Sequence, residues 1–309
     1  MATYRILSID GGGIRGVLTA VVLQRLSDEP SLNGWLDSVD LLAGTSTGGL
    51  LALAIANNLG LDTIRDLYVT KGEKIFNDSL LDEILDLFTL LGANYNISNL
   101  KRELENIFGQ TTLDQLQKRV LITTFNLDNE SEDPVKRSWK PKLFHNFPGS
   151  DNDGDELAYK VGLYTSAAPT YFQSFDGFID GGVYAPNPSM CALAQTQDPR
   201  NPNDVPLSNI VLLSLGTGTS LDYISGKNHD WGYVQWAKPL VTLTLEGVSG
   251  IADYQCNQIL RQRYHRCAPT FLPGVSIPMD AVKKIPYMID FAMSLDLTET
   301  IKWIKDQWM

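Results

Sequence analysis

The chain has 309 residues and is 43% hydrophobic, which is enough to form a packed core in one or two domains. Its formal net charge of −11 argues against nucleic acid as a partner and limits any attraction to an anionic membrane to local patches. Three cysteines do not make a complete disulfide framework, and neither C-x-x-C nor H-E-x-x-H occurs, so we expect no metal site and no cofactor.

The sequence shows no secretory signal and no apolar run of the ~18 residues needed to cross a bilayer. We therefore expect a cytoplasmic protein and leave peripheral contact with membranes open. Apolar runs typical of strands occur at 4–9, 39–42, 120–125 and 210–215, and helical patterns lie between them, notably at 61–76, 97–108 and 113–118. This alternation predicts an α/β fold with a mainly parallel sheet covered on both faces.

The first apolar run ends in Asp10-Gly11-Gly12-Gly13-Ile14-Arg15-Gly16, and a helical pattern follows. Consecutive glycines allow several backbone N–H groups to point at one spot near the positive end of a helix, where they can hold negative charge. In acyl transfer that charge is the oxyanion of the tetrahedral intermediate. Two roles stay open for Arg15, a supporting positive field or a pair with a surface carboxylate.

Gly11, Gly13 and Gly16 also match G-x-G-x-x-G, the fingerprint of a dinucleotide site. That fingerprint requires an acidic residue about 20 positions further on, at the end of the next strand. Here the next expected strand ends at Gly44-Thr45-Ser46 and not at a carboxylate. The pattern without this partner is weak support for nucleotide binding.

Gly44-Thr45-Ser46-Thr47-Gly48 reads as G-x-S-x-G between the run 39–42 and the helix-favouring run 50–56. This pattern is typical of a tight strand-to-helix turn that exposes a serine hydroxyl above the sheet, and Gly44 and Gly48 avoid a clash across the bend. The sequence thus predicts a nucleophilic Ser46. Further along, residues 79–91 carry an apolar stripe with acidic residues opposite, which fits a lid over the site, a surface that rests on lipid or an ordinary core-facing helix.

A third segment, Phe178-Ile179-Asp180-Gly181-Gly182, places a carboxylate before two glycines. If Asp180 contacts Ser46, it can take the hydroxyl proton as the general base. An ordinary aspartate has a pKa near ~3.9, too low for a base at neutral pH, so we expect burial near Ser46 to raise it.

The order of these three motifs resembles the patatin-like phospholipase family. The segments Thr165-Ser166-Ala167-Ala168-Pro169 and Leu215-Gly216-Thr217-Gly218 also fit, and the resemblance covers roughly residues 4–220. It implies a three-layer α/β/α fold and lipid acyl hydrolysis through an acyl-enzyme, by a Ser–Asp dyad without histidine. The expected substrate is a phospholipid or another acyl lipid.

Carried over to this chain, the resemblance makes Ser46 the nucleophile and Asp180 its base, with Gly11, Gly12 and Gly13 forming the oxyanion hole. One departure is Pro186, where the family usually has an asparagine. Two alternatives to this enzyme remain. One is a catalytically silent module that binds lipid or nucleotide, and the other is an esterase with an α/β-hydrolase-type Ser-Asp-His triad.

In the triad alternative, His229 or His265 would join Ser46 and Asp180. Both histidines lie in polar settings where an exposed or hydrogen-bonded side chain is more common than a base. We expect a catalytic core at 1–220 and a mainly helical part at 221–309 packed on the same domain. In that second part, Arg261, Arg263 and Arg266 lie within one or two helical turns if helical, and surface ion pairs are the simplest role for them.

Overall fold

In the computed structural model, which describes residues 2–75, 95–200 and 205–309, the four apolar runs become neighbouring strands of one sheet. The described strands are β1 (Tyr4–Ile9), β2 (Leu41–Thr45), β3 (Arg119–Asn126), β4 (Lys140–His145), β5 (Phe178–Asp180), β6 (Ile210–Leu215) and β7 (Tyr264–Cys267). Their order is β4-β3-β2-β1-β6-β7, and β5 pairs with β3. The pairs within β3-β2-β1-β6-β7 are parallel, whereas β4 and β5 run antiparallel to β3. The predicted α/β class with a mainly parallel sheet is confirmed.

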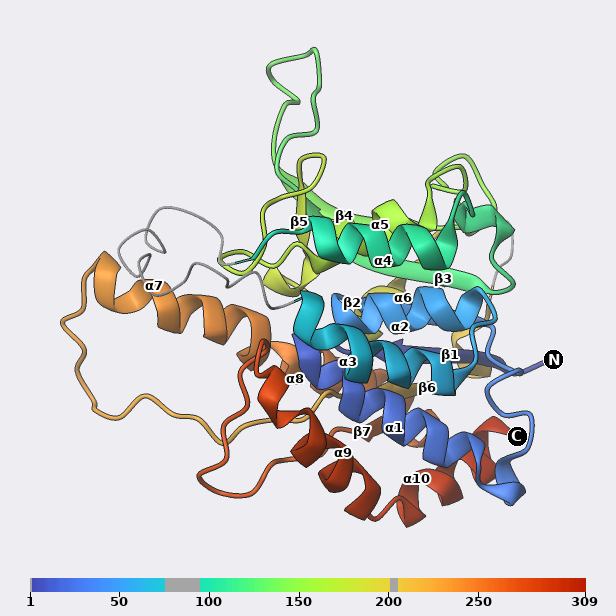
Figure 1. Ribbon diagram of the computed structural model, residues 1–309. Coiled ribbons are helices and arrows are strands. Elements are labelled where there is room, and N and C mark those ends of the chain that lie inside the picture. The colour runs from blue at the N-terminus through green and yellow to red at the C-terminus, as the bar shows by residue number, and fades with distance from the viewer. Residues whose placement is uncertain (1, 76–94, 201–204) are drawn as a thin grey trace.

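Helices cover both faces of this sheet, as Figure 1 shows. The described α-helices are α1 (Gly16–Ser27), α2 (Thr47–Ala56), α3 (Leu61–Ile75), α4 (Ser98–Phe108), α5 (Ala158–Ser166), α6 (Ser189–Gln195), α7 (Tyr233–Thr242), α8 (Ser249–Leu260), α9 (Ile285–Ser294) and α10 (Thr298–Trp303). On one face α1, α2, α4, α5 and α9 contribute to the larger apolar core. On the other face α6 and α8 contribute to the smaller one.

The two cores follow from the alternation of side chains along the strands. In β1, Leu7 and Ile9 belong to the larger core, whereas Ile6 belongs to the smaller core on the opposite face. In β6, Leu213 belongs to the larger core and Leu212 to the smaller one. Both strands therefore place apolar side chains on both faces of the sheet, as a parallel sheet between two helical layers requires.

Several expected elements differ in the structure. The run 113–118 is a 3-10 turn over Leu113–Gln115, because β3 begins at Arg119 and leaves no room for a longer helix. The part after residue 220 contains the strand β7, which extends the sheet beyond β6. The stretch 79–91, interpreted as a lid or a core helix, lies outside the described residues.

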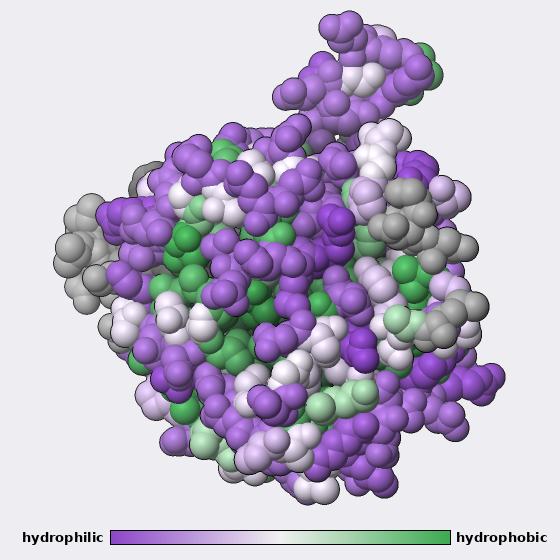
Figure 2. Space-filling view, turned by 90° about the vertical axis from the view of Figure 1, so that its right-hand side faces the viewer, coloured by the Kyte–Doolittle hydropathy of each residue, from purple (hydrophilic) through white to green (hydrophobic). Residues whose placement is uncertain are grey.

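The loop between β3 and β4 projects from the body and is largely hydrophilic on the face seen in Figure 2. Among the described residues, no helix is both long enough and apolar enough to span a membrane.

Candidate active site

Two residues far apart in sequence are brought together by β3. Thr45, the residue before Ser46, pairs with Thr123 on this strand, and Asp180 pairs with the next residue, Thr124. The short strand β5 thus continues along the same edge of β3 where β2 ends. The Ser46 side chain lies close enough to the Asp180 carboxyl to lower its pKa by hydrogen bonding.

Ser46 lies in the tight turn that the G-x-S-x-G pattern predicts. Its φ and ψ are 54° and −127°, in the left-handed half of the map that few side chains adopt, and α2 starts at the next residue. A Cβ on Gly44 would lie 2.3 Å from the Gly48 carbonyl oxygen, and one on Gly48 would lie 2.2 Å from the Ile9 oxygen. Both glycines are therefore required by close backbone approach.

The turn is fixed by a chain of hydrogen bonds to β3. The Ser46 N–H donates to Thr165 Oγ1 over 2.8 Å, and the Thr165 hydroxyl donates to the Thr123 carbonyl oxygen over 2.7 Å. The Thr45 hydroxyl donates to the Ala185 carbonyl oxygen over 2.6 Å. These contacts hold the serine backbone against the strand that also positions Asp180.

Asp180 is almost fully buried, with 2% of its surface exposed. Burial raises the pKa of Asp180 from 3.8 to about 7, although the hydrogen bonds from Ser46 and from the Gly182 N–H oppose that shift. The Gly182 N–H donates to Asp180 Oδ1 over 2.7 Å and the Asp180 N–H donates to the Ala167 carbonyl oxygen over 3.0 Å. The expectation that burial raises the pKa of this carboxyl is confirmed, and the group can exchange a proton near neutral pH.

The glycine-rich loop after β1 lies directly against the Ser46 turn. A Cβ on Gly11 would come within 3.3 Å of the Ser46 Cβ. The Gly11 N–H, however, donates to the Pro186 carbonyl oxygen over 2.9 Å, and the Ile14 N–H donates to the Met279 carbonyl oxygen over 2.7 Å. Among the described residues no acceptor engages the Gly12 and Gly13 N–H groups, so these two are the amides of the loop that remain for an oxyanion.

Pro186, the departure from the family pattern, thus contributes its backbone carbonyl to the Gly11 contact. Any residue supplies a carbonyl, so the proline leaves this contact intact. From the other side the Thr217 hydroxyl donates to the Gly11 carbonyl oxygen over 2.7 Å, and the Asp10 N–H donates to the Leu215 carbonyl oxygen over 3.0 Å. The loop is therefore bound at both of its faces.

Arg15 is buried and its guanidinium donates to the Ile277 carbonyl oxygen over 3.2 Å, and its supporting role stays a prediction. A buried ion pair joins Asp10 to Arg266 in β7, with N–O distances of 2.8 and 2.5 Å. Arg266 also donates to the Ser214 hydroxyl over 2.7 Å. The expectation that Arg266 forms a surface ion pair was wrong, because β7 points this side chain into the protein toward the start of the glycine-rich loop.

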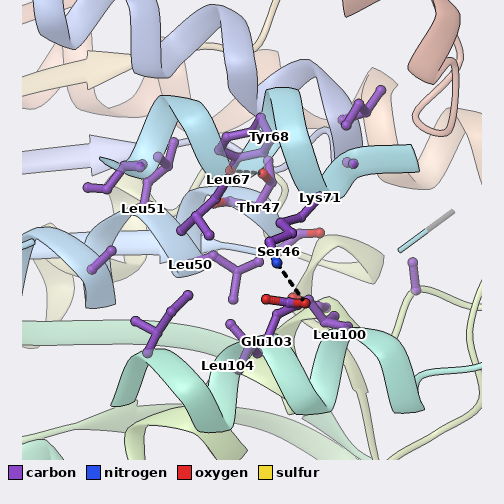
Figure 3. A pocket seen from close by; sticks show the side chains of 18 of the residues that line it. Ser46, Thr47, Leu50, Leu51, Leu67, Tyr68, Lys71, Leu100, Glu103 and Leu104 are labelled. Carbon is purple, nitrogen blue, oxygen red and sulfur yellow. Dashed lines mark hydrogen bonds and ion pairs between the residues drawn. The ribbon is translucent and has the colours of Figure 1, made fainter. Parts of the chain in front are cut away.

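Ser46 opens into a cavity with apolar walls (Figure 3). The walls come from three helices, with Leu50 and Leu51 on α2, Leu67 on α3, and Leu100 and Leu104 on α4. Gly13 of the glycine-rich loop lines the same cavity. The arrangement offers space for a hydrocarbon chain next to the Ser46 hydroxyl and the glycine-rich loop.

The histidines lie elsewhere. His265 Nε2 hydrogen-bonds the Thr300 hydroxyl over 2.9 Å, and its ring stacks on Trp303. His229 lies edge-on against Trp231, and neither ring is among the residues that line the Ser46 cavity. A Ser-Asp-His triad therefore has no support in the geometry of these two side chains.

Comparison with known proteins agrees with this geometry. Residues 7–193 match the family model described as patatin-like phospholipase, and this segment holds all three motifs. The chain belongs to the patatin-like phospholipase family. The resemblance inferred from the motifs is confirmed, and membership supports a hydrolase that acts on lipids.

Curated relatives match this patatin-like chain over nearly its full length. A putative sporulation hydrolase of Bacillus subtilis, CotR, is 31% identical over 100% of this chain and 99% of its own. A cGAMP-activated phospholipase of Pseudomonas aeruginosa is 28% identical over 97% of this chain and 86% of its own. A probable inactive patatin of Solanum tuberosum is 28% identical over 89% of this chain and 81% of its own, so the similarity includes a protein described as probably inactive.

Among solved structures, VipD of Legionella pneumophila aligns with a TM-score of 0.44 at 10% identity, covering 94% of this chain and 67% of VipD. This likeness is too distant to support an argument.

Sequence reasoning missed several residues that shape the patatin site. The family segment at 165–169 does not single out Thr165, although its hydroxyl holds the Ser46 backbone. Met279 and Arg266 follow residue 220, where no motif marks them, and both contact the glycine-rich loop or its first residue. No local pattern identifies such contacts, because each joins chain segments at least 119 residues apart.

Proposed function

We propose that this protein is a carboxylic ester hydrolase that cleaves acyl chains from lipids, with Ser46 as nucleophile and Asp180 as base. The single observation that carries the proposal is that Ser46, which lines an apolar cavity, lies close enough to the buried Asp180 carboxyl to lower its pKa by hydrogen bonding. A hydroxyl paired with a carboxyl whose pKa is about 7 is an activated nucleophile at neutral pH.

In the first half of the reaction, the Ser46 Oγ attacks the ester carbonyl carbon while its proton passes to Asp180. The tetrahedral oxyanion accepts hydrogen bonds from the Gly12 and Gly13 amides, and its collapse forms the acyl-enzyme. The leaving alcohol takes the proton from Asp180. In the second half water gives a proton to Asp180, attacks the acyl carbon and releases the fatty acid, and Ser46 recovers its proton.

A silent binding module is the alternative, since a plant relative is described as probably inactive. Against it, this chain keeps both Ser46 and Asp180 and the strained turn that holds the serine. Strain at a non-glycine residue is costly and persists where the surrounding structure over-determines it, most often at functional sites.

The test compares wild type with Ser46→Ala on a short-chain nitrophenyl ester, with Ser31→Ala as a control at an exposed serine. We expect Ser46→Ala to reduce kcat by at least roughly 1000-fold, as removal of a catalytic serine does in other serine hydrolases. Circular dichroism establishes that each variant is folded. Equal rates in wild type and Ser46→Ala would remove the catalytic assignment and favour the binding module.

A further inference from the structure

Among the described residues that line the cavity beside Ser46, one is a cation and one is an anion, and the others are uncharged. Lys71 on α3 and Glu103 on α4 both line it, and the Lys71 Nζ lies 3.3 Å from the Glu103 Oε1. Figure 3 shows this contact as a dashed line between the two helices, next to Ser46 in the view. The Lys71 side chain is 33% exposed and that of Glu103 is 13% exposed, so the pair faces both the cavity and solvent.

This pair differs from the surface pairs of the same helices. Lys101 and Glu105, for example, are one turn apart on α4, are each more than 40% exposed and lie outside the cavity. Such pairs contribute little and are easily explained as solvated helix surface. Lys71 and Glu103 instead connect two helices across an apolar cavity, where a charge without a partner is costly.

The pair restricts which polar group a substrate can place beside it. A neutral head group offers no charge that could replace either partner. An anionic group can bind Lys71, but it leaves Glu103 without compensation and is repelled by it. A zwitterion whose anionic and cationic ends lie close together can bind Lys71 and Glu103 at once, so no charge is left unpaired.

We propose that Lys71 and Glu103 select zwitterionic phospholipids, with the phosphodiester bound at Lys71 and the ammonium group at Glu103. The inference rests on the proposed function, since the same lipid must present its acyl ester to Ser46. In a glycerophospholipid the phosphate and the acyl esters share one glycerol unit, so a head group beside the catalytic serine is expected. Lys71 and Glu103 thereby determine specificity, and neither takes part in bond cleavage.

The experiment measures kcat/KM on three soluble short-chain lipids with identical acyl chains: dihexanoyl phosphatidylcholine, dihexanoyl phosphatidylglycerol and dihexanoylglycerol. All are used below the concentration at which they form micelles, because an anionic surface would repel a protein of net charge −11 and imitate selectivity. The variants are Glu103→Gln, Lys71→Gln and the double variant, which leaves no lone charge in the cavity. Lys101→Gln removes the same charge from the exposed side of α4 as a matched control.

We expect wild type to prefer the choline lipid, and Glu103→Gln to reduce the choline-to-glycerol head-group ratio roughly tenfold, as loss of a charged partner typically does. Lys71→Gln should lower kcat/KM on both phospholipids roughly tenfold relative to dihexanoylglycerol. The double variant should lose the preference among the three lipids, and Lys101→Gln should keep the wild-type ratios. Equal losses on all three substrates, or the same change of ratio in Lys101→Gln, would overturn the inference.

A binding measurement separates this inference from the proposed function. Ether-linked analogues of the three lipids cannot be hydrolysed, and their Kd for Ser46→Ala protein is measured by calorimetry with and without the Glu103→Gln change. The choline analogue should bind more tightly than the other two, and Glu103→Gln should remove that difference. If the protein binds the choline analogue selectively but hydrolyses no ester, only the hydrolase proposal is wrong. If it hydrolyses esters but binds the three analogues equally, only the assignment of head-group selection to Lys71 and Glu103 is wrong.

Discussion

Thr45 and Asp180 pair with adjacent residues of one strand, Thr45 with Thr123 and Asp180 with Thr124. Because β3 carries both pairings, the separation of the proposed nucleophile, Ser46, and the proposed base, Asp180, is set by strand register. Neither side chain depends on a mobile loop for its position, since each is adjacent to a ladder of backbone hydrogen bonds. The base is therefore expected to be in place before substrate arrives.

Replacing Asp180 with Asn removes the base while keeping its shape. We expect kcat to fall by at least roughly 1000-fold, in the range seen when a triad carboxylate is removed from a serine protease. Hydrolysis of a nitrophenyl ester measures the loss, and Asp155→Asn at an exposed position is the control. A folded Asp180→Asn protein with wild-type turnover would contradict the role of this carboxyl.

The same substitution has a second effect, on stability. Burial raises the pKa of Asp180 from 3.8 to about 7, so the folded protein holds this proton more tightly than the unfolded chain does. The stabilisation from this group is full below the unfolded pKa and is lost as the pH rises through 7. At pH 9 Asp180→Asn should therefore be more stable than wild type, by on the order of 4 kcal/mol. Urea unfolding at pH 5 and 9 measures this gain, which must be larger at pH 9.

The pH–rate profile tests the catalytic consequence of that pKa. The base acts when ionised, so kcat/KM should fall about tenfold for each unit of pH below 7. A substrate with no titratable group keeps the profile specific to the enzyme. A profile that stays flat down to pH 4 would show that the active carboxyl is not the buried one.

Arg266→Met tests the buried ion pair with Asp10. The change leaves a carboxylate buried without its counter-ion, so we expect a loss of roughly 3–5 kcal/mol in the free energy of unfolding. The double variant Asp10→Leu with Arg266→Met removes both charges and should recover most of that stability. Arg137→Met, which removes an exposed partner of Asp128, is the control and should cost less than about 1 kcal/mol. Equal losses in the free energy of unfolding for Arg266→Met and Arg137→Met would show that the buried ion pair stabilises the fold no more than an exposed one.

Gly44→Ala tests the close backbone approach in the Ser46 turn. The added methyl group would lie 2.3 Å from the Gly48 carbonyl oxygen, so the turn must shift and both stability and activity should fall. Gly250→Ala is the control and should change stability in the opposite direction, because this exposed glycine in α8 has open space around it. That change should stabilise the protein by about 0.5–1 kcal/mol. Thermal unfolding distinguishes the two.

The sequence predicted the elements that rest on strong local patterns. The strands at 4–9 and 210–215 have the predicted bounds, because both are apolar runs buried on two faces. Two of the three motifs meet because the Ser46 turn and the glycine-rich loop follow parallel neighbours, β2 and β1, whose carboxyl ends share one edge of the sheet.

Other features left no local signal. The strand β5 has three residues and is defined by its pairing with β3, and β7 is a four-residue strand among arginines that resembled a helical surface. The Lys71–Glu103 contact and the Gly11–Pro186 hydrogen bond each join distant segments, so neither spacing nor composition indicates them. Contacts of this kind are decided by tertiary packing.

The strand β7 limits how far this protein can be shortened from its C-terminal side. A fragment ending near residue 220 would keep every recognisable motif, yet it would expose the unpaired backbone groups of β6 along one edge. It would also leave the buried Asp10 carboxylate, at the start of the glycine-rich loop, without its ion-pair partner Arg266. Expression of such a fragment should yield aggregation-prone material, and the shortest autonomous unit must reach past Cys267.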